Sequence, residues 1–473
     1  MRNPNLINKF IASLISPARD LLDRLLLITE AHGTPAYLVG GPLRDLLLDQ
    51  PSLDLDIAVE ADAIALARRL AEKHPRRRDA PKARLGAGTA ATTSEIRVTT
   101  YPTFLTATVR IPGFHLDLIT ARSETYAPPG ALPTVRPATI REDLRRRDFT
   151  INSLALRLNG ADAGEILDPT GGLADLDSRL IRALHERSFQ DDATRILRAG
   201  RYASRLNFTI ETDTLAWLKR HLSYLDTISG ARLHHEFSRI LAEDAPEETL
   251  SALQDHGALA AIHPALRFER LHAAVFARLR HLNPTGARAA YWPVLAWRLT
   301  EAEAADLARR LALTKAQRAS LETMPALQRL SLPPTSVAQG PSLEPGKHHP
   351  SLSSVAQGPS LEPASLHDPH LKRSALVDML SPFPLPALWA FAILTSDKAV
   401  HERLLDYLTK ARHERPHLTG DDLLAMGVPR GPQLGDILSR LRSARLDGEV
   451  HTRGTEERIV REALASNALT TDN

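Results

Sequence analysis

The sequence has no cysteine and no long apolar run. Without cysteine, none of the 473 residues can form a disulfide or offer a thiolate to a metal. No apolar stretch is long enough to cross a bilayer, so we expect no membrane partner. A chain that needs no disulfide suits a reducing compartment, and we expect a cytoplasmic protein. These absences exclude a disulfide-stabilised secreted domain and a membrane-spanning protein.

Lysine is also scarce, because nine of the 59 cationic residues are lysine and the other 50 are arginine. The net charge is only +3, and the isoelectric point near 9.1 is a mild indication of an anionic partner. Arginine suits phosphates and base edges, although a GC-rich genome produces the same excess, and both causes stay open. The length predicts two to four domains, with 43% hydrophobic and 24% charged residues as in globular proteins.

The segment 37–48 contains a double glycine. An apolar run ends at Gly40 and Gly41, and a helical pattern with Arg44 and Asp45 follows, which predicts a strand, a turn and a helix. Glycine lets backbone N–H groups approach a phosphate without a Cβ in the way, and a helix start adds unpaired donors. The turn is therefore a candidate site for an anion.

Residues 53–59 alternate between apolar and other side chains, with the period of a strand that has one buried face. Asp54 and Asp56 would then share a face, where two carboxylates repel unless a cation lies between them. Mg²⁺ prefers carboxylate oxygens and also binds substrate phosphates. Alone, a double glycine or an Asp-x-Asp pattern is more often a simple turn or a polar strand edge. Together, at this spacing, they indicate nucleotidyl transfer.

Strand and helix patterns alternate up to about Leu158 and are almost entirely helical beyond it. The periodicities predict helices over 16–33 and 61–74 and strands over 97–101 and 114–120. We therefore expect an α+β protein in which a mixed-sheet head precedes an α-helical remainder.

A Pro-, Ser- and Gly-rich stretch interrupts the helical part. The ten residues 336–345 recur unchanged at 354–363, which is typical of a linker, with a docking peptide as the less favoured alternative. The predicted domains are a nucleotidyltransferase head (1–157), a helical neck (158–230), a helical body (231–331), the linker (332–370) and a helical tail (371–473).

Several motifs in a fixed order carry a resemblance to a known family. They are Leu38–Asp45 with Asp54–Asp56, Arg146–Ser153, Asp168–Leu176, Asp191–Arg195, and Arg232 with Glu236. The series resembles the bacterial tRNA nucleotidyltransferases and poly(A) polymerases of the class II nucleotidyltransferase superfamily, which build or repair the CCA end of tRNA. The resemblance covers about residues 30–265, and Gly420–Gly448, which includes 427–435, is similar to the tail of longer bacterial members. Two departures are Pro42, where a variable residue is usual, and Asp191, where the family commonly has Glu.

The resemblance implies that Asp54 and Asp56 are the catalytic acids and bind two Mg²⁺ ions. One ion would lower the pKa of the tRNA 3′-hydroxyl for attack on the α-phosphate, and the other would stay with the leaving pyrophosphate. Asp117, on the strand pattern at 114–120, is a candidate third metal ligand. A structural hydrogen bond is the equal alternative for Asp117.

The resemblance also assigns the nucleotide contacts. The residues are Gly40, Gly41, Arg44 and Asp45 at the triphosphate; Arg147, Asp148 and Asn152 near the ribose; and Asp192, Arg195 and Arg198 in the nucleotide-selecting motif. Cytosine and adenine share an exocyclic amino donor beside a ring-nitrogen acceptor. Three positions apart on a helix, Asp192 and Arg195 would offer an acceptor and a donor to that edge. The alternative is a weak surface ion pair.

A basic stripe continues along the same predicted helix at Arg195, Arg198, Arg201 and Arg205. Next to a nucleotide site, such a stripe is expected to contact the triphosphate or the tRNA backbone. A solvated helix face is the structural alternative.

The expected function is addition of C, A or both from CTP and ATP to the tRNA 3′ end, with tRNA, CTP and ATP as partners and Mg²⁺ as cofactor. Complete CCA addition and partial addition of CC or A stay open, as does a poly(A) polymerase. A non-catalytic RNA-binding protein is a further alternative, which the acids at 54 and 56 disfavour. The sequence leaves the oligomeric state open.

Overall fold

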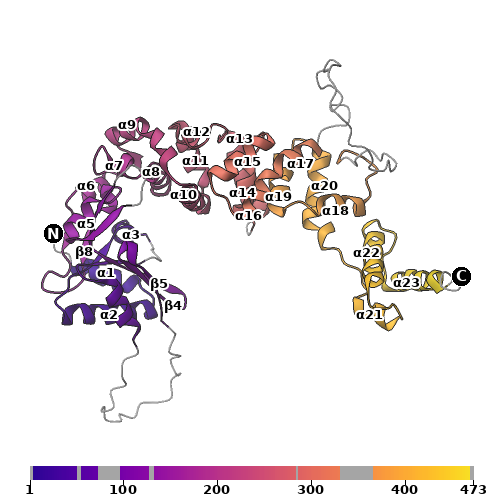
Figure 1. Cartoon of the computed structure of the whole chain (residues 1–473), viewed down its shortest axis with the longest axis horizontal. Helices are drawn as coiled ribbons and strands as arrows, with labels where there is room; N and C mark the ends of the chain where they lie inside the picture. Colours follow the sequence, from indigo (N-terminus) through magenta and orange to yellow (C-terminus); the bar gives the residue numbers. More distant parts are fainter. Residues whose placement is uncertain are drawn as a thin grey trace, which may run out of the picture. The chain divides into compact units, whose positions relative to one another are not determined.

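The computed structural model describes residues 4–50, 55–72, 96–126, 133–283, 286–330 and 366–468. Asp54 and both copies of the repeated ten-residue segment lie outside these ranges. The chain divides into two compact units, residues 1–262 and 263–473 (Figure 1). This division falls inside the segment predicted as the helical body, and the finer domain boundaries stay predictions.

The first unit is built on a seven-stranded mixed sheet, which confirms the predicted α+β class. The strand order is β3-β4-β5-β2-β1-β8-β9, with β2 and β5 parallel and all other neighbours antiparallel. The strands are β1 (Ala36–Val39), β2 (Asp56–Val59), β3 (Arg97–Tyr101), β4 (Thr106–Ile111), β5 (Phe114–Thr120), β8 (Ala155–Arg157) and β9 (Ile166–Leu167). Strands β3 and β5 have the predicted bounds.

Amphipathic helices cover the sheet because their apolar residues recur at helical spacing. Helices α2 (Ser16–Ala31) and α4 (Ala63–Ala71) pack against each other, and α4 also packs on β3, β4 and β5. Helix α5 (Ile140–Arg145) places Ile140 and Leu144 in an apolar cluster with Ala58. The prediction of one buried face for residues 53–59 is therefore wrong past Asp56, because Ala58, on the same strand face, is fully buried.

A separate two-stranded ribbon follows strand β5 in the sequence. It pairs β6 (Arg122–Thr125) with β7 (Thr134–Pro137) in antiparallel register. Ribbon and sheet are connected directly, because β5 ends at Thr120 and β6 begins two residues later. Strand β6 therefore begins next to the end of β5, which is the strand that carries Asp117.

The Asp-Pro-Thr-Gly-Gly motif forms the start of helix α6 (Gly172–Asp177). Asp168 accepts hydrogen bonds from the backbone N–H groups of Gly172 and Leu173 at 2.8 and 3.0 Å, which satisfies donors at the helix start. A Cβ on Gly172 would lie 2.2 Å from the carbonyl oxygen of Thr150. Only glycine lets α6 pack this closely on the turn that contains Asn152.

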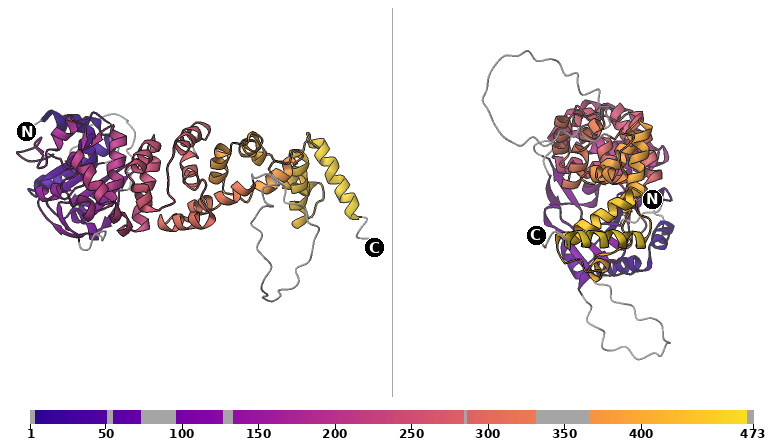
Figure 2. Two further views of the ribbon diagram at one scale, coloured as in Figure 1. Left: turned by 90° about the horizontal axis from the view of Figure 1, so that it is seen from above. Right: turned by 90° about the vertical axis from the view of Figure 1, so that its right-hand side faces the viewer.

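Short strands β10 (Leu180–Ile181) and β11 (Thr209–Ile210) form a parallel pair, and no strand follows Ile210 in the part of the chain that the structure describes (Figure 2). The first unit has further helical elements within the described ranges. They are α1 (Pro4–Ser13), α3 (Gly41–Leu47), η1 (Pro102–Phe104), η2 (Thr150–Asn152), α7 (Ser188–Asp191), α8 (Thr194–Leu206), α9 (Thr212–Arg220), η3 (Leu222–Thr227), α10 (Gly230–Ala242), α11 (Pro246–Asp255) and α12 (Ala258–Ile262).

The described part of the second unit is helical. Its elements are α13 (Arg270–Leu282), α14 (Ala287–Val294), α15 (Glu301–Arg310), α16 (Lys315–Glu322), α17 (Met324–Leu330), α18 (Arg373–Leu380), α19 (Leu385–Leu394), α20 (Lys398–Thr409), η5 (Ala411–His413), α21 (Gly420–Ala425), α22 (Pro432–Leu446) and α23 (Arg453–Ala468). Leu418, Leu423 and Leu441 belong to an apolar cluster of the last three helices. In the described ranges, no single helix is long and apolar enough to cross a membrane, and α18 with α19 pass such a test only as a pair bent by 116°.

Candidate active site

Two carboxylates lie side by side on the parallel strands at the centre of the sheet. Asp56 opens β2, and its register partner on β5 is Asp117. Paired positions on neighbouring strands project from the same face of a sheet. Thr108 Oγ1 donates a hydrogen bond of 2.6 Å to Asp117 Oδ1. Asp117 thus fits both roles that the sequence left open, since it accepts a structural hydrogen bond and neighbours the predicted catalytic acid.

The glycine turn brings a guanidinium close to these acids. Gly40 follows β1 with φ +71°, a conformation that favours glycine. A Cβ at this position would lie 2.9 Å from Arg147 Nη1 and 3.7 Å from Asp56 Oδ2. The predicted strand, turn and helix are confirmed. Glycine at position 40 permits the positive φ, and its lack of a side chain has a second effect. It leaves space for Arg147.

Arg44 and Asp45 form a buried pair at the start of α3. Arg44 Nε and Nη2 donate to Asp45 Oδ1 at 2.8 and 2.6 Å, and Nη1 donates to Asn152 Oδ1 at 2.7 Å. Asp45 Oδ2 accepts from Arg205 Nη2 at 3.3 Å. Arg44 is only 2% exposed, and its contacts join α3 to η2. These contacts give Arg44 a positioning role, and direct binding of triphosphate stays a prediction.

Asp148 connects the head to α8. Its Oδ1 accepts from Asn152 Nδ2 at 3.0 Å, and its Oδ2 accepts from Arg198 Nε at 2.9 Å. Burial by itself would raise the pKa of Asp148. The charge of Arg198 and the hydrogen bonds from Asn152 and Arg198 outweigh burial, so the pKa of Asp148 lies below its ordinary value. Asp148 is therefore ionised under all ordinary conditions.

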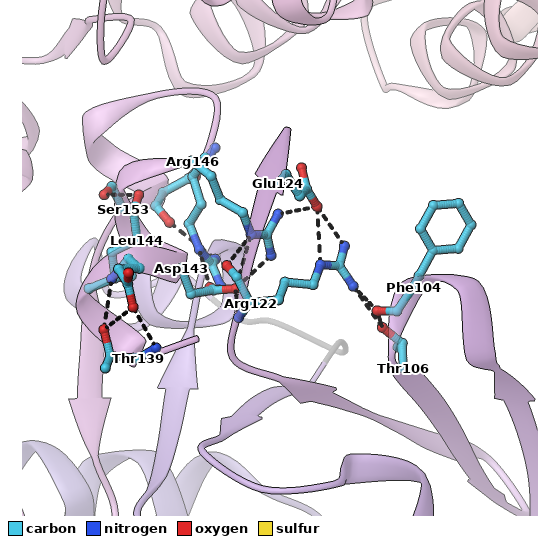
Figure 3. Close-up of polar contacts among 12 residues, drawn as sticks. Phe104, Thr106, Arg122, Glu124, Thr139, Asp143, Leu144, Arg146 and Ser153 are labelled. Carbon is cyan, nitrogen blue, oxygen red and sulfur yellow. Dashed lines mark hydrogen bonds and ion pairs between the residues drawn. The ribbon is translucent and has the colours of Figure 1, made fainter. Parts of the chain in front are cut away.

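Arg147 is held by a carboxylate that the sequence did not single out. Asp143 is fully buried on α5, and its Oδ2 accepts from Arg147 Nε and Nη2 at 3.2 and 2.9 Å. Its Oδ1 accepts from Arg146 Nη2 at 2.7 Å (Figure 3). Burial would raise the pKa of Asp143, but the two guanidinium groups bring it below the ordinary value. The spacings of three and four residues on a helix are the local signal that could have revealed this cluster.

The prediction that Asp192 and Arg195 share a helix face is wrong. Asp192 has extended backbone dihedrals before α8 begins, and its Oδ1 accepts from Thr194 N at 2.9 Å. An aspartate two residues before a threonine is suited to such a local bond, which competes with helix. Asp192 pairs with Arg232 at 2.7 Å instead of with Arg195. Arg195 Nη1 donates to Ser188 Oγ at 2.7 Å, and its Nη2 donates to the Arg146 carbonyl at 2.8 Å.

The remaining arginines of the predicted stripe are not a solvated face. Arg198 lies 5.5 Å from the centroid of the Tyr202 ring and Arg201 lies 4.7 Å from it. Arg201 is 3% exposed and donates from Nη1 to Glu243 Oε1 at 3.2 Å. Its Nε and Nη2 are buried without a hydrogen-bond partner among the described residues. Both atoms are shielded from solvent beside the Tyr202 ring.

These residues surround one cavity of about 850 Å³. All of the predicted site residues within the described ranges line it, so Asp54 is the one whose position stays untested. Residues that the sequence did not assign to the site also line it, namely His115, Ile119, Glu124, Tyr126, Tyr202 and Arg239. Within the described ranges, no group of three or more His, Cys, Asp or Glu side chains is arranged to hold a metal ion.

Comparison with known proteins supports the assignment from motifs. A family model described as the poly A polymerase head domain matches residues 36–182, and one described as the probable RNA and SrmB-binding site of polymerase A matches residues 207–269. The CC-adding tRNA nucleotidyltransferase of Geobacter sulfurreducens is 31% identical over 472 residues, with 93% of each chain covered. The chain belongs to the class II tRNA nucleotidyltransferase and poly(A) polymerase family. The family predicted from the motifs is confirmed.

Relatives in this family differ in which nucleotides their names say they add. The A-adding tRNA nucleotidyltransferase of Geobacter sulfurreducens is 32% identical over 90% of this chain, and the match spans 44% of that relative. The chain spans about a quarter to a half of the length of the A-adding relatives that it matches. A solved structure of a CCA-adding enzyme in complex with ATP has a TM-score of 0.65 at 25% identity, covering 97% of this chain and 98% of that one.

Replacing Gly40 with alanine tests the close approach of Arg147. The new Cβ would displace the guanidinium, and we expect affinity for CTP and ATP, measured by isothermal titration, to fall between about 10- and 100-fold. Gly113→Ala is the matched control, because Gly113 has a similar φ of +76° but nothing within 4 Å of its Cβ position. Equal loss of affinity in both variants would show that backbone strain alone is responsible.

Asp148→Asn tests the buried ion pair. Arg198 would lose its close carboxylate and keep Glu236 at 3.9 Å, which is expected to lower the free energy of unfolding by about 3–5 kcal/mol. Because the pKa of Asp148 is lowered by folding, its contribution is complete above the unfolded value near 3.9 and is lost as pH falls through the folded value. The deficit should therefore be constant from about pH 5 to 8 and shrink below about pH 4 in urea unfolding.

The exposed pair of Asp162 with Arg157 supplies the control for this measurement. Their separation is 3.8 Å and the Asp162 side chain is 54% exposed, so Asp162→Asn should cost less than about 1 kcal/mol. A deficit for Asp148→Asn that is no larger than this, or one that grows as pH falls, would contradict the buried pair.

Proposed function

We propose that the chain is a template-independent tRNA nucleotidyltransferase that adds C, A or both from CTP and ATP to the tRNA 3′ end. The supporting observation is that one cavity contains the paired acids, the glycine turn and the nucleotide-selecting motif. Family membership supports the same chemistry. The absence of cysteine agrees with action in the cytoplasm.

Enzymes with this head typically use divalent metals. The described acids fit such a group, because Asp56 and Asp117 offer carboxylate oxygens from adjacent positions of parallel strands. We assign Mg²⁺ to Asp56 and Asp54, with Asp117 as the third ligand. When bound, the metal would neutralise charge on the triphosphate and favour ionisation of the attacking hydroxyl.

The chain's own residues position the nucleotide. We place the ribose next to Asp148 and Asn152, with Arg147 beside it, and the triphosphate along the turn at Gly40 and Gly41. The two unpartnered donors of Arg201 would bind phosphate oxygens, which would remove the free-energy cost of leaving buried N–H groups without acceptors. In this arrangement Arg44 and Arg198 support the site by fixing Asn152 and Asp148.

Base selection requires an acceptor and a donor at the base edge. The hydrogen bonds and ion pair of Asp192 described above all use Oδ1. We assign Oδ2 to accept from the exocyclic amino group of cytosine or adenine, and Arg195 to donate to the neighbouring ring nitrogen. Uracil and guanine present a carbonyl and an N–H at these places and would leave both protein groups unpaired.

A substrate panel separates the functional alternatives. We expect incorporation of CTP, ATP or both into tRNA transcripts that end before the first C, after C or after CC, each tested with single nucleotides. Complete CCA addition extends all three transcripts, a CC-adding enzyme extends the first two with CTP, and an A-adding enzyme extends the last with ATP. Long A tails on unrelated RNA would show a poly(A) polymerase, and no extension at all would contradict the proposal.

Asp56→Asn tests the acids, with Asp54→Asn as its companion. We expect each to lower nucleotide incorporation by about 100-fold or more while tRNA affinity in filter binding stays largely intact. Asp62→Asn is the control, because Asp62 caps α4 and asparagine caps equally well. Incorporation by Asp56→Asn at the rate of the unmodified protein would contradict the assignment.

A further inference from the structure

Strand β6 and the residue that follows it carry an alternating series that the sequence did not assign to the site. Arg122, Glu124 and Tyr126 are two residues apart, so they project from one side of the ribbon. Glu124 Oε1 accepts from Arg122 Nε at 3.1 Å, and its Oε2 accepts from Tyr126 Oη at 2.6 Å. The Glu124 side chain is 5% exposed and lines the cavity. A buried carboxylate that accepts this many hydrogen bonds has a fixed position and restrains the side chains bonded to it.

Arg146 links this series to α5. Its Nη1 donates to Glu124 Oε1 at 2.8 Å, while its Nη2 donates to Asp143 Oδ1 at 2.7 Å (Figure 3). Its Nε donates to the carbonyl oxygen of Arg122 at 3.1 Å. Figure 3 shows the Arg146 guanidinium between the two carboxylates. Burial would lower the pKa of Arg146, but Asp143 and Glu124 raise it above the ordinary value.

The same residue supports the proposed base-selecting arginine. The Arg146 carbonyl accepts from Arg195 Nη2 at 2.8 Å, and Ser188 Oγ accepts from Arg195 Nη1 at 2.7 Å. These two acceptors fix the plane of the Arg195 guanidinium. One of them belongs to a residue whose side chain is fixed by Glu124. A change at Glu124 can therefore reorient Arg195 without touching the nucleotide.

We propose that Glu124 is a positioning residue for nucleotide selection, acting through Arg146 on Arg195 and through Tyr126 on the cavity wall next to it. This inference rests on the proposed role of Asp192 and Arg195 in base selection. The hydrogen bonds of Glu124 described above go to Arg122, Tyr126 and Arg146, and through Arg146 they reach Arg195. We therefore expect its main effect on which base is accepted. Loss of its charge should weaken discrimination more than it lowers the kcat of incorporation.

The test compares Glu124→Gln with the unmodified protein. For each, kcat/KM is measured for the nucleotide that its tRNA substrate accepts and for UTP and GTP. We expect the ratio of correct to incorrect nucleotide to fall about tenfold, mainly through a higher KM for the correct one, because Arg195 still lies in the cavity but less well oriented. Glu142→Gln on α5 is the control, since its capping box with Thr139 tolerates glutamine.

Two further variants keep the test decisive if Glu124→Gln does not fold. Tyr126→Phe removes one bond to Glu124 and retains the ring, and Arg146→Lys retains the carbonyl but loses the forked contact with both carboxylates. Each should lower the same ratio. An equal loss of kcat/KM for all four nucleotides, or an unchanged ratio in all three variants, would overturn the inference. Failure of the unmodified protein to extend any tRNA would instead refute the proposed function.

Discussion

The buried ion pair of Asp148 with Arg198 determines how the head and α8 meet. Asp148 follows α5 beside the sheet, whereas Arg198 is on the helix that carries Arg195 and Arg201. Two buried charges lose their hydration and are tolerated only when they pair and their remaining groups are hydrogen bonded. Asn152 and Tyr202 supply those further contacts. The pair thus fixes which face of α8 is directed at the acids on β2 and β5.

Arginines outnumber acids around the cavity. Eight arginines and six carboxylates line it, and most of the arginines donate to a carboxylate or a carbonyl of the chain itself. The carboxylates hold the guanidinium groups in position, so a nucleotide meets donors that need little rearrangement. Because the cations exceed the acids, a polyanionic triphosphate is favoured there. Arg201 lines the cavity and has two buried donors without a hydrogen-bond partner among the described residues.

Local signals in the sequence predicted the elements that depend on neighbouring residues. The double glycine marked the turn after β1, and alternation marked β3 and β5 with the correct bounds. Contacts between segments that are distant in the sequence could not be predicted from these patterns. Asp143 and Glu124 are separated by a stretch that includes β7, and nothing in their spacing shows that Arg146 lies between them. Helical periodicity places Asp192 on a helix, but the bond from the Thr194 backbone N–H to its side chain competes with helix and keeps its backbone extended.

The contacts assigned to Asp192 and Arg195 cannot by themselves distinguish C from A, because both bases present the amino group and ring nitrogen that these residues would read. A difference between adding CC, A or all three nucleotides must then come from how the cavity accepts bases of different size. If Arg195 reads the base edge as proposed, its orientation would set how far from α8 that edge lies, and the Arg146 carbonyl helps fix this orientation. If the hydrogen bonds among Glu124, Arg146 and Arg195 were rigid, the cavity would accept bases of one size. On the proposed reading, an enzyme that adds both bases would need Arg146, and the β6 residues bonded to it, to accommodate bases of both sizes.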